Sequence, residues 1–261
     1  MNLREALTDK LTQKEMEALR TSFDVIGDIA IIEIPIELKK KEKLIGKTIL
    51  ALFKNIKAVA AAGEHTGKYR KQKLRLIAGE KRFETTHKES GMLFKTDVSQ
   101  CYFSPRLGSE RLRIAKQVKK GETVLVVGSG IAPYPLIISK YSPATRIMAV
   151  EANPAAHKYA AQNIILNKAR NIILVKGDIR KLPLGKFDRI ISAIPHEGVK
   201  LMPALLKFAK KGTFLHVYDF AFGEDLKEPA RKMKGCKILQ VVKTQQVGVR
   251  RYRVCIDAKF L

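Results

Sequence analysis

The sequence has few cysteines, and their positions exclude two common roles. Cys101, Cys236 and Cys255 are the only three among 261 residues, and no two of them form a CxxC pair. Structural zinc sites and the disulfide frameworks of small secreted proteins both need closely spaced sets of cysteines. We therefore expect no metal site, and a reducing compartment, the cytoplasm, is the expected location.

Long apolar runs are also missing. No segment reaches about 18 uninterrupted apolar residues, the length that a membrane-spanning helix needs. The first residues lack the apolar core of a secretory signal peptide. The sequence therefore predicts a soluble protein that has no membrane partner.

Acidic residues are scarce relative to basic ones. The chain has 25 Asp and Glu against 50 Lys and Arg, which leaves a formal net charge of +25. Such an excess attracts polyanions over long range, with an affinity that falls as salt rises. Nucleic acid is the predicted partner. Adaptation to high temperature is the alternative explanation, but thermophile surfaces usually balance Lys with Glu and this sequence does not.

The pattern in residues 121–139 is that of a strand, a glycine turn and a helix. Residues 124–127 are a short aliphatic run that predicts a buried strand, and Gly128-Ser-Gly130 follows directly. Glycine suits such a turn because it admits unusual backbone dihedrals and lets a ligand approach closely. A nucleotide-like cofactor is the usual ligand, and an ordinary turn in an unliganded α/β domain is the alternative.

Further predicted strands follow at the spacing of a parallel sheet. Residues 146–150 lead into Glu151, and a carboxylate at the tip of the second strand can bind the hydroxyls of a ribose. Two more predicted strands and their turns are residues 171–176 with Gly177-Asp178, and residues 187–192 with Ala193-Ile194-Pro195. Because the carboxyl ends of parallel strands share one edge, we expect these turns to line one crevice.

The glycine turn lacks the third glycine of a dinucleotide-binding fingerprint. Pro133 occupies that position and Pro135 follows, whereas the fingerprint needs close helix packing and a helix N-terminus that is free to bind pyrophosphate. S-adenosylmethionine has no phosphate, and it needs a carboxylate for its ribose, a slot for its adenine and room for its methionine end. It is therefore the predicted cofactor.

The first 96 residues differ from the rest and predict a separate, smaller α+β domain. Residues 29–34 and 57–62 predict strands, and residues 38–53 predict a basic amphipathic helix. Residues 63–75 carry five cationic side chains, which either form a solvated basic loop or contact RNA phosphates. Three further segments predict an antiparallel meander: residues 74–80, 83–87 and 92–97.

A turn and a helix start are predicted just before the glycine-turn strand. Ser109 would cap the helix, and Glu110 would lie in its first turn, where a carboxylate is favoured. Arg106 and Glu110 are four residues apart and could simply pair on one helical face. Alternatively, they could hold and deprotonate a nucleophile. Towards the C-terminus, the sequence predicts a helix at residues 203–211 and strands at residues 213–220, 237–242 and 252–258. The predicted sheet then has about seven strands. A second basic patch is formed by Lys243, Arg250, Arg251 and Arg253.

These motifs together resemble the archaeal and eukaryotic tRNA (guanine-N1)-methyltransferases that modify guanosine 37, next to the anticodon. The resemblance is strongest to an archaeal branch, of which some members also methylate carbon 7 of a wyosine precursor. The matching segments are Val25-Ile-Gly-Asp-Ile-Ala30, Gly67-Lys-Tyr-Arg-Lys71, Ala78-Gly-Glu80, Thr86-His-Lys-Glu-Ser-Gly91, Tyr102-Phe-Ser-Pro-Arg-Leu107, Glu110-Arg111, Pro133-Tyr-Pro135, Val150-Glu151, Gly177-Asp178 and His216-Val-Tyr-Asp-Phe220. The Phe-Ser-Pro-Arg segment with Glu110-Arg111 is specific, whereas the sheet motifs would fit any class I methyltransferase.

The resemblance implies a fold, a set of domains and roles for single residues. The fold would be a class I, Rossmann-like α/β methyltransferase in residues 97–261, with residues 1–96 as an RNA-binding α+β domain. Glu110 would be the general base that removes the N1 proton of guanine, and Arg70 would hold the guanine O6. The implied cofactor residues are Arg111, Tyr102, Gly128, Gly130, Pro133, Tyr134, Glu151, Ala152, Asp178, Ile179, Ser192 and Pro195. The implied substrate residues are Arg106, Lys68, Lys71, Ala193 and His196.

Two departures from the family pattern bear on substrate binding. The wider family ends its fourth strand in Asn-Leu-Pro or Asn-Pro-Pro, and its asparagine helps to place the guanine, whereas Ala193 stands there in this sequence. Many archaeal members begin with an extra domain that contacts the tRNA elbow, and we expect none here. Recognition by a monomer should therefore depend on the anticodon stem-loop and the basic surface, with the target base flipped out of its stack.

Two other functions stay open. A related tRNA aminocarboxypropyltransferase of wyosine synthesis uses the same cofactor but transfers its other carbon chain; the form of Arg106 with Glu110-Arg111 argues against it. An RNA-binding protein with a degenerate methyltransferase fold is the second. Ala193 favours that reading, and the intact glycine turn and strand-tip carboxylates oppose it.

Overall fold

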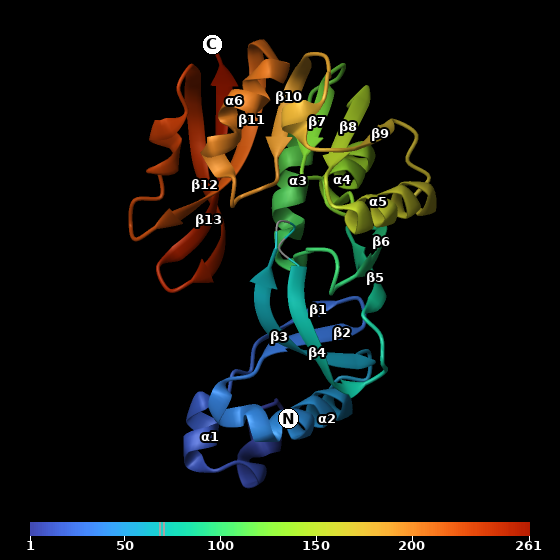
Figure 1. Ribbon diagram of the computed structural model, residues 1–261, viewed down its shortest axis with the longest axis vertical. Coiled ribbons are helices and arrows are strands. Elements are labelled where there is room, and N and C mark those ends of the chain that lie inside the picture. Colours follow the sequence, from blue (N-terminus) through green and yellow to red (C-terminus); the bar gives the residue numbers. More distant parts are fainter. Residues whose placement is uncertain (68, 70) are drawn as a thin grey trace. The chain divides into compact units, whose positions relative to one another are not determined.

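The computed structural model describes residues 1–67, 69 and 71–261, apart from the side chain of His65. The chain divides into two compact units, Met1–Pro105 and Arg106–Leu261 (Figure 1). No helix of the described residues is both long enough and apolar enough to cross a membrane.

The first unit is built on a four-stranded sheet of order β1-β2-β3-β4. Its strands are β1 (Phe23–Ile26), β2 (Ile29–Glu33), β3 (Ala58–Thr66) and β4 (Lys71–Gly79), and its helical segments are η1 (Glu5–Lys10), α1 (Gln13–Ala18), η2 (Ile36–Lys41) and α2 (Glu42–Leu52). β2 and β3 are parallel, so a crossover joins them, and η2 and α2 form it. Ile45 and Ile49 of α2 are fully buried in one cluster with Ala30 and Val59 of the sheet.

The predicted meander of the first unit is wrong in its pairing. β4 pairs with β3, while β5 (Glu84–Glu89) and β6 (Met92–Asp97) form a separate two-stranded sheet. Gly79, with φ +86°, ends β4, and Glu80 donates to the carbonyl of Lys57 before the chain turns away. An alternating pattern identifies a strand but not its partner, so this separation could not be predicted from the pattern.

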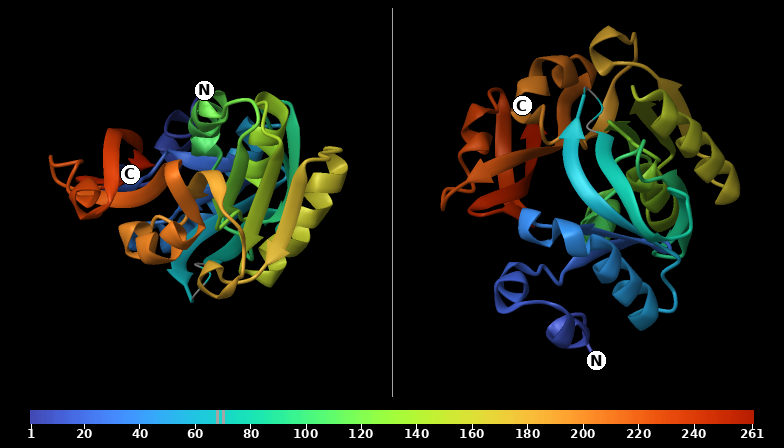
Figure 2. Two further views of the ribbon diagram at one scale, coloured as in Figure 1. Left: turned by 90° about the horizontal axis from the view of Figure 1, so that it is seen from above. Right: turned by 60° about the horizontal axis from the view of Figure 1, so that its bottom comes forward.

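The second unit is a seven-stranded sheet of order β12-β13-β11-β10-β7-β8-β9. Its strands are β7 (Thr123–Val127), β8 (Arg146–Glu151), β9 (Ile172–Lys176), β10 (Phe187–Ser192), β11 (Ala209–Phe222), β12 (Cys236–Gly248) and β13 (Arg251–Phe260). β7 to β11 run parallel, and β13 is antiparallel to both β11 and β12. Figure 2 shows β12 and β13 on one side of the unit and β9 with α5 on the other. This mostly parallel sheet confirms the predicted fold class.

Helices and short 3₁₀ segments connect the strands of the second unit. They are η3 (Pro105–Leu107), which spans the boundary, α3 (Gly108–Gln117), α4 (Pro133–Tyr141), α5 (Pro154–Leu166), η4 (Ile179–Lys181), η5 (Gly198–Leu201), α6 (Met202–Leu205), η6 (Leu206–Phe208) and η7 (Pro229–Lys232). The chain moves outward from β7 through β8 to β9, then returns to place β10 on the other side of β7. The carboxyl ends of β7 and β10 therefore flank a topological switch point, where open α/β sheets bind ligands.

Three local predictions for the second unit need correction. Leu107 occupies the N-cap position of α3, so Ser109 does not cap it, although Glu110 does lie in the first turn. Helical structure after Met202 ends at Phe208, and β11 already begins at Ala209. β12 and β13 are longer than predicted; in β12, three register shifts break the simple alternation that marks a strand.

Candidate active site

The glycine turn after β7 is packed tightly against the turn after β10. Gly128 has φ +69°, and a Cβ there would lie 2.3 Å from Cγ1 of Ile194. The nitrogens of Gly128 and Ser129 donate to the carbonyl of Val150 at 2.9 and 3.0 Å, and the nitrogen of Ala193 donates to Val127 at 2.9 Å. Glycine is needed at position 128 for its conformation and because this approach leaves no space for a side chain.

The turn enters α4 through a left-handed residue. Ala132 has φ +71°, and Pro133 begins the helix, where its missing N–H leaves no intrahelical hydrogen bond unmade. Nδ2 of the buried Asn163 donates to the carbonyl of Ile131 at 3.0 Å, so α5 holds this turn in place. Tyr134, the next residue of α4, is buried.

Glu151 connects the glycine turn to the tip of β8. Its Oε2 accepts from the nitrogen of Gly130 at 2.7 Å, and its Oε1 accepts from the nitrogen of Asn153 at 2.6 Å. Burial raises the pKa of Glu151, while these hydrogen bonds act to lower it. Each carboxylate oxygen can accept a second hydrogen bond, so this side chain can receive ribose hydroxyls.

The remaining strand ends offer further polar groups. Asp178 follows β9 and is hydrogen-bonded to its neighbour Arg180, and Ile179 beside it is buried. Ser129 and Ser192 are buried, and within the described part of the chain neither hydroxyl oxygen has a hydrogen-bond partner. An unpaired buried hydroxyl costs about 1–3 kcal/mol. Two of them at the carboxyl ends of neighbouring strands fit a site that takes a polar ligand such as S-adenosylmethionine.

Glu110 is buried in the first turn of α3 and accepts three hydrogen bonds. Oε1 accepts from the hydroxyl of Tyr218 at 2.6 Å and from Nη2 of Arg113 at 2.8 Å, and Oε2 accepts from Nε of Arg113 at 2.7 Å. Its ion pair is therefore with Arg113 and not with Arg106, which is exposed. Burial raises the pKa of Tyr218 well above its usual value, which keeps this hydroxyl protonated as a donor.

Glu110 is joined to the cofactor turn through two tyrosines. The ring of Tyr218, whose hydroxyl binds Glu110, lies 5.7 Å from the ring of Tyr134 at the start of α4. α3 and α4 also pack against each other. The carboxylate that the sequence singled out as a base thus lies near the turn that it singled out as the cofactor site.

A buried polar network extends from Arg113 into the sheet. Arg113 donates to Asp257 at 2.6 Å, and His216 Nδ1 lies 2.7 Å from the other oxygen of Asp257. Burial lowers the pKa of His216, and the nearby guanidinium groups lower it further, although Asp257 opposes this. The imidazole is therefore neutral: Nδ1–H donates to Asp257, and Nε2 accepts from Arg189 at 2.6 Å.

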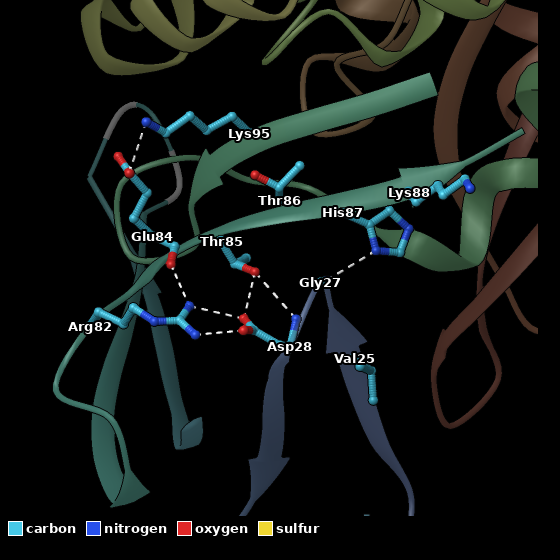
Figure 3. Close-up of a pocket in the computed structure, with 10 residues that line it drawn as sticks. All are labelled: Val25, Gly27, Asp28, Arg82, Glu84, Thr85, Thr86, His87, Lys88 and Lys95. Atoms are coloured by element: carbon cyan, nitrogen blue, oxygen red, sulfur yellow. Dashed lines mark hydrogen bonds and ion pairs between the residues drawn. The ribbon is translucent and has the colours of Figure 1, made fainter. Parts of the chain in front are cut away.

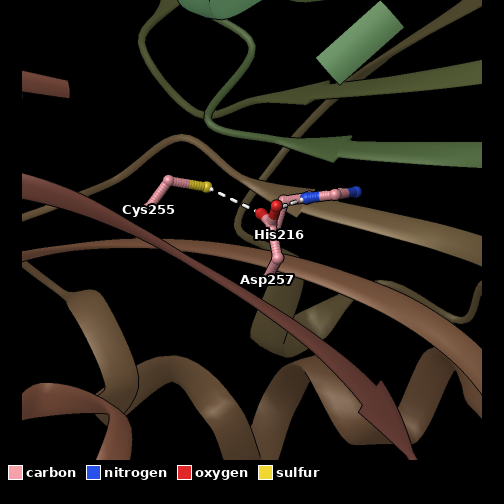
Figure 4. A group of neighbouring side chains, drawn as sticks. All are labelled: His216, Cys255 and Asp257. Carbon is pink, nitrogen blue, oxygen red and sulfur yellow. Dashed lines mark hydrogen bonds and ion pairs between the residues drawn. The ribbon is translucent and has the colours of Figure 1, made fainter. Parts of the chain in front are cut away.

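His216, Cys255 and Asp257 place three ligand-type atoms within 4.8 Å of one another (Figure 4). Their chemistry does not fit a metal centre. Burial raises the pKa of Cys255, so the thiol keeps its proton, whereas metals bind the thiolate. Arg113 and Arg189 also bring two positive charges into direct contact with Asp257 and His216. The cluster is a hydrogen-bonded part of the core.

The structure gathers most predicted site residues in the second unit. Those on η3 or α3, or at and just after the ends of β7, β8, β9 and β10, are Arg106, Glu110, Arg111, Gly128, Gly130, Pro133, Tyr134, Glu151, Ala152, Asp178, Ile179, Ser192, Ala193, Pro195 and His196. Tyr102 and Lys71 belong to the first unit, and Lys68 and Arg70 lie outside the described residues. Sequence reasoning missed Arg113 and Tyr218. Arg113 could have been found from its spacing, because residues three apart on a helix lie on the same face and Arg113 follows Glu110 at that distance.

A hollow of about 790 Å³ in the first unit was not predicted (Figure 3). It lies between the β1–β2 turn and β5, where Gly27 donates to Nδ1 of His87 at 3.1 Å. Arg82 pairs with Asp28 at its wall, and Lys88 and Lys95 also line it. Glu84 pairs with Lys95 at 3.0 Å, so most of the charge in the hollow is balanced.

Two family models match the chain. Residues 3–82 match the TYW2 N-terminal domain, and residues 85–244 match the TRM5/TYW2 methyltransferase domain. Over 250 residues the chain is 39% identical to the tRNA (guanine(37)-N(1))-methyltransferase Trm5b of Pyrococcus abyssi, covering 92% of this chain and 74% of that protein. Over 251 residues it is 30% identical to a tRNA(Phe) (4-demethylwyosine(37)-C(7)) aminocarboxypropyltransferase of Methanocaldococcus jannaschii, covering 91% and 97%.

A solved structure agrees with these matches. The complex of aTrm5 with tRNALeu superposes on this chain with a TM-score of 0.91 at 31% identity, covering 100% of this chain and 78% of that one. The methyltransferase model alone matches more than half of the chain. The chain belongs to the TRM5/TYW2 methyltransferase family.

Proposed function

We propose that this chain methylates N1 of guanosine 37 in tRNA, with the anticodon stem-loop as the RNA element that it binds. The likeness to Trm5b over 92% of the chain supports this. The observation that carries it is the buried Glu110 carboxylate, held by Tyr218 and Arg113 and connected through Tyr134 to the glycine turn. A base is needed there because N1 of guanine carries a proton.

The cofactor is S-adenosylmethionine, which supplies an electrophilic methyl group when it is bound. Glu151 would bind its ribose, and Asp178 with Ile179 would flank its adenine. The hydroxyls of Ser129 and Ser192 would find partners in the same ligand. These residues hold and orient the donor and take no part in the proton transfer.

Glu110 would act as the general base through one particular oxygen. Oε1 already accepts two hydrogen bonds, while Oε2 accepts one, from Arg113. Oε2 therefore keeps a lone pair for the N1 proton of guanine. With that proton moved to Oε2, the N1 electron pair would be available to form a bond to the methyl carbon, and the bond from that carbon to sulfur would break to leave neutral S-adenosylhomocysteine. A positioned base contributes roughly 10²–10⁴-fold to the rate, and Arg70 is proposed to hold the guanine O6.

We assign tRNA binding in the first instance to residues 1–96 and methyl transfer to residues 97–261. The match of residues 3–82 to the TYW2 N-terminal domain supports this assignment. The three cysteines form no disulfide, which fits a reducing compartment, and we place a monomeric enzyme in the cytoplasm.

The test is mass spectrometry of nucleosides from a tRNA transcript incubated with the protein and S-adenosylmethionine. We expect N1-methylguanosine from a transcript with guanosine at position 37, and none when adenosine replaces it. Glu110→Gln should lose roughly 10²–10⁴-fold in single-turnover rate with unchanged affinity for S-adenosylhomocysteine. An aminocarboxypropyl adduct would favour the second relative's reaction, and binding without product would favour a degenerate enzyme. A transcript carrying the wyosine precursor tests methylation at carbon 7.

A further inference from the structure

The hairpin of β12 and β13 extends beyond the edge of the sheet that holds the candidate active site. Val217 is the last β11 residue paired with β10, yet β11 runs five residues further, to Phe222. Phe222 pairs with Arg251 of β13, which in turn pairs with Gly248 of β12. At about 3.3 Å per residue, five residues carry β11 roughly 16 Å past the carboxyl end of β10. Figure 1 shows β12 and β13 beside β11 in the same sheet.

Positive charge on this hairpin is not balanced locally. Residues 234–253 contain six Lys and Arg and no Asp or Glu. Lys243 and Arg251 are exposed, and no carboxylate among the described residues pairs with either. Arg250 differs, because it has an exposed partner in Glu224 at 3.4 Å. Unpaired surface cations keep their full charge for an anionic partner.

Aromatic rings hold these cations in place. The guanidinium of Arg251 lies 4.4 Å from the ring centre of Phe220 and 5.3 Å from that of Phe222. Nζ of Lys243 lies 4.0 Å from the ring centre of Tyr252. Phe222 is nonetheless 64% exposed, which is unusual for a large apolar ring. Cations fixed on rings, beside an exposed ring, are the pattern of surfaces that bind single-stranded nucleic acid.

We propose that the surface formed by Phe222 at the end of β11, Arg251 at the start of β13 and Lys243 on β12 binds the unpaired RNA nucleotides that flank the target nucleoside. Lys243 and Arg251 contact backbone phosphates, and the free face of Phe222 stacks on a base. The proposal rests on the tRNA substrate proposed above, since it places the surface beside the nucleotide to be modified. The hairpin lies on the same edge of the sheet as the turns after β7 and β10, so RNA seated there reaches the site.

Equilibrium binding of a fluorescent tRNA transcript tests this, because it does not depend on turnover. Lys243→Ala and Arg251→Ala should each weaken binding by on the order of tenfold at 0.1 M salt and lower the slope of log Kd against log salt by about 0.7–0.9. Phe222→Leu should weaken binding by roughly tenfold and leave that slope unchanged. Lys237→Ala is the matched control, because this exposed cation lies on the same strand at the far end of the hairpin.

Several outcomes would overturn the proposal. Wild-type affinity and slope in the Lys243→Ala and Arg251→Ala variants would do so, and so would an equal effect of Lys237→Ala. Self-association of Lys243→Ala with unchanged RNA binding would show that this lysine only protects an edge strand. Arg251→Lys, which keeps the charge, controls for folding and should retain most of the slope. Hairpin-dependent binding without methylation of guanosine 37 would defeat the proposed function and leave this surface standing.

Discussion

Glu110 is held by one donor from its own helix and one from a strand that is distant in sequence. Tyr218 lies 108 positions away in sequence and Arg113 only three, yet both bind the same carboxylate. Together they fill both lone pairs of Oε1 and fix the plane of the carboxylate, so the remaining lone pair of Oε2 has a defined direction. Such preorganisation is what a general base requires, because proton transfer depends on geometry before it depends on acidity.

Removing the hydroxyl of Tyr218 tests this positioning role. Tyr218→Phe keeps the ring that packs near Tyr134 and loses the hydrogen bond to Oε1. A hydrogen bond to a charged group contributes about 1.5–3 kcal/mol, so we expect kcat to fall by roughly ten- to hundredfold. The KM for tRNA and the Kd for S-adenosylhomocysteine should stay the same. Equal losses in kcat and cofactor affinity would instead indicate a general disturbance of the core.

Glu110 and Glu151 could be predicted as site residues because each lies at a recognisable point of a local sequence pattern. One follows a turn at a helix start, and the other ends a strand. The partners of Glu110 were not accessible in the same way. Tyr218 belongs to a strand that reaches the site only once β11 has joined the sheet beside β10, and no local pattern encodes that contact.

At the scale of elements, one buried network ties α3 to the sheet. Arg113 of α3 binds Asp257 of β13, and Asp257 accepts from His216 of β11. Although burial acts to raise it, hydrogen bonds from His216 and Arg113 hold the pKa of Asp257 far below its usual range. The helix that carries Glu110 is therefore fixed by charges and hydrogen bonds as well as by apolar packing.

This network predicts that acid destabilises the second unit. Because burial lowers the pKa of His216 in the folded state, the unfolded chain binds its proton more readily. The contribution of neutral His216 to folding stability is therefore present above the ordinary histidine pKa of 6.5 and is lost as the pH falls below that value. The pKa of Asp257 is also lowered in the folded state, so a second loss of stability is expected as the pH falls below its ordinary pKa of 3.8.

Calorimetric melting between pH 7.5 and 5.5 measures the first loss. We expect the Tm of wild type to fall over this range and that of His216→Gln to change less. The pKa of His157 is also lowered by burial, so His157→Gln serves as the control for a second titrating group. Identical pH dependence in wild type and His216→Gln would remove His216 as the source.

Among the elements, strands and helices were easier to predict than their pairing. The parallel core followed from strands that end in glycine or acidic turns at regular spacing. The pairing of β4 with β3, and the separate hairpin of β5 and β6, depend on tertiary contacts such as those of Asp28 with Arg82 and Thr85. A period of two residues carries no information about which neighbour a strand will take.

At the scale of the whole molecule, a net charge of +25 is distributed over both compact units. Some cations are neutralised within the fold, as Arg113 is by Glu110 and Asp257. Others, such as Lys243 and Arg251, meet no carboxylate in the described residues. Composition was sufficient to predict a polyanionic partner. It could not say which cations would remain available, because that depends on contacts distant in sequence.

Salt should therefore weaken the binding of tRNA much more than the binding of the cofactor. Raising the salt concentration from 50 to 200 mM is expected to weaken tRNA binding by one or more orders of magnitude through counterion release. The affinity for S-adenosylhomocysteine, which presents no row of phosphates, should change far less. Titration calorimetry for the small ligand and anisotropy for the transcript provide the comparison. Parallel weakening of both would indicate a loss of folded protein.

The close approach of Gly128 and Ile194 connects the turn after β7 to the turn after β10. Ile194 follows Ala193, a proposed substrate residue, and Gly128 begins the turn that is proposed to hold the donor. The two turns therefore lie in close contact. A ligand that displaces one turn is therefore expected to displace the other, so binding of S-adenosylhomocysteine should change the affinity for tRNA.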